Sequence, residues 1–100
     1  MTTFRTTRRA DADIIDIYVF GVNNFGRIAA ENYIAGLKRL LSLLSAHPGI
    51  ARLITEFIPH LRVHPHGSHI VIYREDAEGI LVLRVLAGAA DWERHIGGEA

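Results

Sequence analysis

Residues 80–86 read Ile80-Leu81-Val82-Leu83-Arg84-Val85-Leu86, an almost continuously apolar run that contains one charge. A run of this length and composition is typical of a strand that is covered on both faces. The dense β-forming run Ile70-Val71-Ile72-Tyr73 and the alternating segment Leu61-Arg62-Val63-His64 precede it. They predict two further strands, with turns at residues 66–68 and 76–79. Residues 60–86 are therefore predicted to form an antiparallel meander.

The first half of the chain predicts a short strand over Thr3–Thr6 and two helices. Thr7 can cap a helix from about Arg8 to Gly21, and acidic residues follow in its first turns. Its apolar stripe consists of Ala10, Ile14, Ile17, Tyr18 and Gly21. After a break at residues 21–24, a second helix is predicted from about Phe25 to Ala46, ended by Pro48. Its apolar stripe consists of Ala30, Tyr33, Leu37, Leu40, Leu41 and Leu44.

These elements predict an α+β fold of order β-α-α-β-β-β, in which a helical hairpin packs on a small antiparallel sheet. Two helices alone would leave one side of their apolar seam in water, so the strands must supply the second layer. We expect one domain over residues 1–100, because the chain shows no linker and no repeat. The core is predicted to include Tyr33, Leu40, Leu44, Ile72 and Leu83.

The amino-acid composition excludes several classes of function for this chain. The chain has no cysteine, so it offers neither disulfides nor thiolate metal ligands, which suits a reducing cytoplasm. Lys plus Arg and Asp plus Glu number 11 each, so the excess positive charge that supports direct nucleic-acid binding is missing. The N-terminus lacks the apolar run of a signal peptide, and no stretch has the length of a membrane span. We expect a cytoplasmic protein with no membrane partner.

Four histidines in one short segment, His60, His64, His66 and His69, raise the possibilities of a metal site and of a general base. Pro65 is expected to disrupt the strand between two of them, and within this segment no carboxylate follows until Glu75. We therefore predict no metal, no cofactor and no catalytic residue, with His69 as a hydrogen-bonded structural residue.

The predicted binding residues are Arg62, Arg74, Arg84 and Trp92. An arginine within an apolar strand must reach an open face or pair with a carboxylate, which could belong to this chain or to an acidic partner. Trp92 either plugs the edge of the domain or contacts a partner, since Trp and Arg dominate interface hot spots. We expect the arginines to be exposed at an open sheet edge.

The whole pattern resembles the ParE branch of the ParE/RelE toxins of bacterial toxin–antitoxin pairs. The resemblance rests on Thr7-x-x-Ala10-x-x-Asp13-Ile14-x-x-Ile17-Tyr18, on Phe25-Gly26 with Ala29, Ala30 and Tyr33, on Leu37 and Leu40, and on His47-Pro48-Gly49. In the second half it rests on Leu61-Arg62-Val63, His69-Ile70-Val71-Ile72-Tyr73-Arg74 and Ile80-x-x-Leu83-Arg84-Val85-Leu86, followed by Gly88 and Asp91. The resemblance depends on the order and spacing of these motifs.

The resemblance implies a non-enzymatic toxin that inhibits DNA gyrase and forms a hetero-oligomer with a ParD-like antitoxin of the ribbon-helix-helix type. The alternative is a RelE-like endoribonuclease that cuts messenger RNA in the ribosome, because both branches share one fold. RelE-like chains carry basic residues at the positions of Ala89 and Ala90, which cannot stabilise phosphate charge. ParE-like chains often carry His at Ala87 and Arg near Ala89, so a toxin fold with reduced toxicity is a third possibility.

Overall fold

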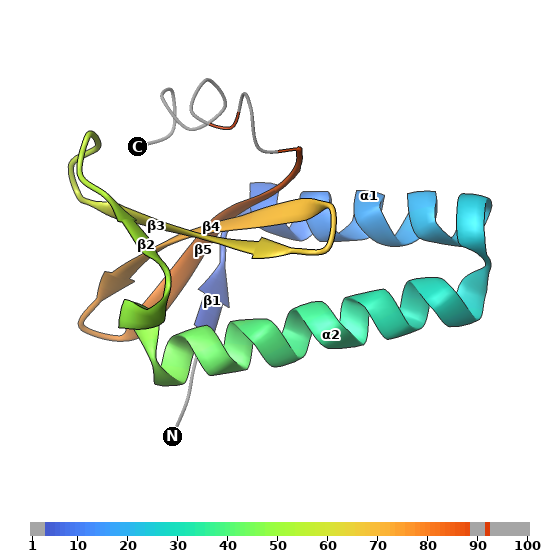
Figure 1. The fold of residues 1–100 in the computed structure, drawn as a ribbon, viewed down its shortest axis with the longest axis horizontal. Helices are drawn as coiled ribbons and strands as arrows, with labels where there is room; N and C mark the ends of the chain where they lie inside the picture. The colour runs from blue at the N-terminus through green and yellow to red at the C-terminus, as the bar shows by residue number, and fades with distance from the viewer. Residues whose placement is uncertain (1–3, 89–91, 93–100) are drawn as a thin grey trace.

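The computed structural model describes residues 4–88 and Trp92, and it places a long helical hairpin against one twisted sheet (Figure 1). The elements in chain order are β1 (Phe4–Thr6), α1 (Arg8–Phe25), α2 (Arg27–Ala46), a 3-10 turn η1 (Pro48–Ile50), β2 (Arg52–Ile54), β3 (Leu61–His66), β4 (His69–Asp76) and β5 (Gly79–Ala87). The predicted α+β class and the hairpin packed on strands are confirmed.

The sheet has five strands in the order β1-β5-β4-β3-β2. Strand β1 runs parallel to β5, whereas the other neighbours pair antiparallel, so the sheet is antiparallel except at one edge. The sequence did not predict β2, which pairs with β3 through three residues only. Three residues are too few to establish an alternation, so this strand had no readable signal.

The predicted break after Gly21 is wrong, because α1 continues to Phe25. Gly21 lies where the two helices approach closely: a Cβ placed on it would stand 3.1 Å from the Ala30 Cβ. The glycine therefore serves helix packing. The chain turns instead at Gly26, whose φ of +92° favours glycine. The capping prediction is confirmed, since Ala10 N–H donates to Thr7 Oγ1 at 3.0 Å.

Apolar residues on both faces of the sheet are buried. The cluster on the helix side contains Ala10, Leu37, Leu41, Leu44, Ala51, Val71, Tyr73, Ile80, Val82 and Val85. The cluster on the other face contains Ile54, Leu61, Ile70, Ile72, Leu83 and Leu86. The prediction that β5 is covered on both faces is thus confirmed. Leu44, Ile72 and Leu83 are buried as predicted. Leu40 is only half-buried, at the margin of the helix-side cluster, and Tyr33 is also only half-buried.

Strand β3 passes through Pro65, so the expected disruption at this proline is wrong. Pro65 pairs with Ile70 of β4, while β2 covers only Leu61–Val63 on the opposite side. At Pro65 one side of β3 is therefore an edge, where a missing N–H removes no ladder bond. Within the described residues, neither helix is long and apolar enough to cross a membrane.

Candidate functional site

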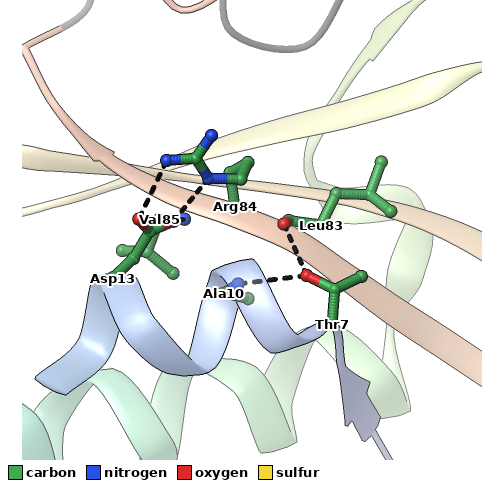
Figure 2. A network of polar contacts seen from close by, with 6 residues as sticks. All are labelled: Thr7, Ala10, Asp13, Leu83, Arg84 and Val85. Atoms are coloured by element: carbon green, nitrogen blue, oxygen red, sulfur yellow. Dashed lines mark hydrogen bonds and ion pairs between the residues drawn. The ribbon is translucent and has the colours of Figure 1, made fainter. Parts of the chain in front are cut away.

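Arg84 forms an ion pair within the chain (Figure 2). Its Nε and Nη2 donate to the two carboxylate oxygens of Asp13 at 2.7 Å and 2.9 Å. The Val85 N–H also donates to this carboxylate at 3.0 Å. The two side chains are only 11% and 13% exposed, so the guanidinium and the carboxylate are shielded together. The expectation that Arg84 is exposed is wrong, and the expectation that it pairs with a carboxylate is confirmed.

The same network explains how α1 is held on the sheet. β1 pairs with β5 only over Ile80–Val82, so the next part of β5 has no strand on that side. Thr7 Oγ1 donates to the Leu83 carbonyl at 2.8 Å, and Asp13 takes the Val85 N–H (Figure 2). The side chains of Thr7, the N-cap of α1, and of Asp13 within α1 therefore satisfy backbone groups that a longer strand would otherwise pair.

Arg62 and Arg74 lie on opposite faces of the sheet. Arg62 donates through Nε to Glu75 Oε2 at 2.8 Å and through Nη1 to the Ala51 carbonyl at 2.9 Å. Its side chain is 19% exposed. Arg74 lies two residues after Ile72, on the face away from the helices, and is half-buried.

Trp92 packs on the face away from the helices. Its ring centroid is 6.0 Å from that of Phe57, and it lies against the cluster of Ile72 and its neighbours. This position supports the interpretation that Trp92 plugs the edge of the domain. Together with the positions of the arginines, it shows that the four predicted binding residues do not gather on one surface.

Tyr33 connects α2 to the turn between β3 and β4. Its hydroxyl lies 2.8 Å from the His66 carbonyl and 2.6 Å from His69 Nδ1. Gly67 leaves room for this contact, because a Cβ on it would stand 2.6 Å from the Tyr33 hydroxyl, and its φ is +55°. Burial, and then the charge of His66, lower the pKa of His69 below its ordinary value. The expected hydrogen-bonded structural role of His69 is confirmed.

A pocket of about 270 Å³ lies above this tyrosine, between the far end of the hairpin and the β3–β4 turn. Its lining is mainly apolar and consists of Ile17, Phe20, Gly21, Phe25, Ala29, Ala30, Tyr33, Ser68 and His69. We call it the tip pocket. Sequence reasoning missed it, because Tyr33 was assigned to the core and the apolar residues around the turn were not weighed as surface.

Large apolar side chains are exposed around the tip pocket. Phe20, Phe25 and Ile28 are 61%, 71% and 73% exposed. The Phe20 and Phe25 rings meet edge to face with centroids 6.3 Å apart. Exposed apolar side chains that cluster in this way mark interaction surfaces more often than scattered ones do.

The histidine-rich segment does not assemble a metal centre in the part of the chain that the structure describes, where no three His, Asp or Glu side chains converge. Ala87 is exposed at the end of β5. Ala89 and Ala90, which bear on the comparison with ribonucleases, lie outside the described residues.

Comparison with known proteins decides the family. The family model described as "ParE toxin of type II toxin-antitoxin system, parDE" matches residues 4–92. The chain belongs to this ParE toxin family. A curated relative, Toxin ParE1 of Caulobacter vibrioides, is 29% identical over 97 residues, which cover 97% of this chain and 100% of the relative. The solved structure titled "Chromosomal ParDE TA system from P. aeruginosa" matches with a TM-score of 0.74 and 20% identity, covering 89% of this chain and 98% of the other. That match supports the fold of this ParE family member.

Proposed function

We propose that this ParE family member is a cytoplasmic toxin that inhibits DNA gyrase by binding it, and that a ParD-like antitoxin neutralises it. The observation that carries the proposal is the family match over residues 4–92, which spans both helices and all five strands. The toxin's action then depends on surfaces and not on catalysis.

The side chains support a binding role. Of the predicted arginines, Arg84 is paired with Asp13 and Arg62 with Glu75, so neither is arranged to stabilise a phosphate during cleavage. Ala89 and Ala90 contribute methyl groups where RelE-like chains have basic residues. The exposed apolar side chains around the tip pocket offer a surface for a protein partner.

The four residues proposed to contact a partner are not equally well supported. They are Arg62, Arg74, Arg84 and Trp92. Arg74 is half-buried on the face away from the helices, where the partly buried Trp92 also lies. These two residues are the better candidates for contact with an acidic antitoxin segment. Arg84 would act by holding α1 against β5, because its guanidinium is already engaged by Asp13.

A gyrase assay tests the proposal. Purified protein should inhibit supercoiling of a relaxed plasmid by gyrase, and a type I topoisomerase relaxation reaction should be unaffected. Adding the ribbon-helix-helix protein encoded beside the toxin gene should restore supercoiling. In parallel, primer extension on translating ribosomes should show no codon-specific cuts. Cuts would establish the RelE-like alternative, and inactivity in both assays would favour a toxin fold with reduced toxicity.

A further inference from the structure

The tip pocket has a polar floor whose hydrogen-bonding state can be deduced. The Tyr33 hydroxyl has one proton, and the His66 carbonyl, 2.8 Å away, can only accept. Tyr33 therefore donates to His66. The contact of 2.6 Å between the Tyr33 oxygen and His69 Nδ1 then requires a proton on Nδ1. In neutral His69 the lone pair lies on Nε2.

His69 is held in this state by its surroundings. Its lowered pKa, which burial and the nearby His66 cause, favours the neutral ring. The groups that face it are Tyr33 from α2, His66 from β3 and Ser68 from the turn. Helix α1 adds only residues without charged or polar side chains to the pocket lining, namely Ile17, Phe20, Gly21 and Phe25. No contact in the described part of the chain engages Nε2. The tip pocket therefore combines mainly apolar walls with two polar groups, the His69 ring and the Ser68 hydroxyl.

The walls are fixed in advance. Gly21 and Ala30 bring the helices together at one side of the pocket, and Tyr33 over Gly67 fixes the floor. Phe20 and Phe25 form an edge-to-face pair at the rim. Because the pocket is already formed, less of a ligand's binding free energy is lost to ordering the walls.

The chemistry of the tip pocket limits which kind of ligand can bind in it. A charged group would lose its hydration against walls that provide no opposite charge. An aliphatic group would bury the acceptor of His69 without a partner. A flat aromatic group with one N–H or O–H donor satisfies both the walls and the floor. Indole and phenol rings have this character, and a cavity of about 270 Å³ can hold either.

We propose that the tip pocket binds one aromatic side chain that carries a hydrogen-bond donor, a Trp or Tyr, from the antitoxin. The segment around that side chain would cover Phe25 and Ile28, which are exposed beside the pocket. The choice of partner rests on the proposed function, whereas the chemical selectivity of the pocket does not depend on it.

Small aromatic probes test the selectivity with the toxin alone. Indole should bind the full chain at millimolar concentration and shift the NMR signals of His69 and Tyr33. 1-Methylindole keeps the ring but lacks the donor, so it should bind about fivefold more weakly, the value of roughly one neutral hydrogen bond. Equal affinities for the two probes, or no binding of indole, would overturn the assignment.

Two matched variants locate the probe. Ala29→Leu fills the pocket from α2 and should abolish indole binding. Ala35→Leu adds the same group at another exposed position of the same helix, outside the pocket lining, and should leave binding unchanged. His69→Asn keeps a donor near Tyr33 but removes the second ring nitrogen, so indole and 1-methylindole should then bind alike. If Ala35→Leu weakens binding as much as Ala29→Leu, the pocket is not the site.

The antitoxin provides the second arm. Ala29→Leu should weaken the toxin–antitoxin complex at least tenfold in calorimetric titration, and Ala35→Leu less than twofold, with unchanged melting temperatures. His69→Asn should weaken the complex with the unchanged antitoxin, and replacing the relevant Trp or Tyr of the antitoxin by Phe should make the complex insensitive to His69→Asn. Indole binding combined with no effect of Ala29→Leu on the complex would overturn the antitoxin as occupant, while gyrase inhibition would still stand or fall by its own assay.

Discussion

The two ends of the helical hairpin have similar apolar content but opposite surroundings. At the base, Leu37, Leu41 and Leu44 of α2 pack against the sheet and are at most 1% exposed. At the tip, Phe25 and Ile28 are 71% and 73% exposed. Figure 1 shows the reason: the hairpin extends well past the β3–β4 turn, so its far end has no strands beneath it. Apolar residues at the base stabilise the fold, whereas those at the tip are available to a partner.

The largest effect on stability is expected at the base of the hairpin, where Asp13 binds Arg84. Asp13→Ala leaves a shielded guanidinium without its carboxylate and the Val85 N–H without its acceptor. We expect a loss of about 3–5 kcal/mol in the free energy of unfolding, measured by urea denaturation. The double variant Asp13→Leu with Arg84→Met should recover most of this loss, because it leaves no unpaired charge. A loss below about 1 kcal/mol for Asp13→Ala would mean that water solvates the pair.

Matched aliphatic truncations in α2 compare the two ends directly. Leu44→Ala should cost about 2–5 kcal/mol, because Leu44 is 0% exposed and a cavity would remain. Ile28→Ala should change the free energy of unfolding by no more than about 0.5 kcal/mol, because Ile28 is 73% exposed. Similar losses at both positions would show that the tip is covered by another surface in solution.

These assignments show how far the sequence predicts the fold. Periodicity predicted both stripes and the buried β5, because a residue's contacts at the base follow from its position on a helix or strand. It could not reveal where the sheet ends beneath the hairpin, so Tyr33 was assigned to the core. Gly21 was interpreted as a break, although it serves the close approach of Ala30. Only tertiary structure distinguishes these two uses of glycine.

The candidate site was less predictable than the fold. An arginine in an apolar strand was expected to need a carboxylate, which is correct for Arg84, but its carboxylate lies 71 residues away on α1. The tip pocket joins α1, α2 and the β3–β4 turn, and no local pattern links these segments. Sequence spacing therefore identified the residue types but not their partners.

A smaller effect on stability is expected from pH, through the titration of His69 beneath the hairpin. The pKa of folded His69 lies below its ordinary value of 6.5, so the unfolded chain takes up a proton first as the pH falls. Stability should therefore decrease as the pH falls through 6.5 and level off below the folded pKa. His69→Asn should flatten this part of a melting-temperature profile, and His60→Asn, at an exposed position, should not. An unchanged profile for His69→Asn would contradict the proton linkage.

The smallest effect is expected for the ion pair at the tip, between Arg27 and Glu31. Their Nε and Oε2 atoms are 3.6 Å apart, and the side chains are 75% and 56% exposed, in contrast to the shielded Asp13–Arg84 pair. The order is also unfavourable, since the positive residue stands at the N-terminus of α2 and precedes its acidic partner by four positions. A double-mutant cycle with Arg27→Ala and Glu31→Ala should give a coupling of at most about 0.5 kcal/mol, and 1 M salt should abolish it. A salt-resistant coupling above about 1 kcal/mol would mean that the tip excludes water around charges, and the contrast between the two ends of the hairpin would then no longer hold.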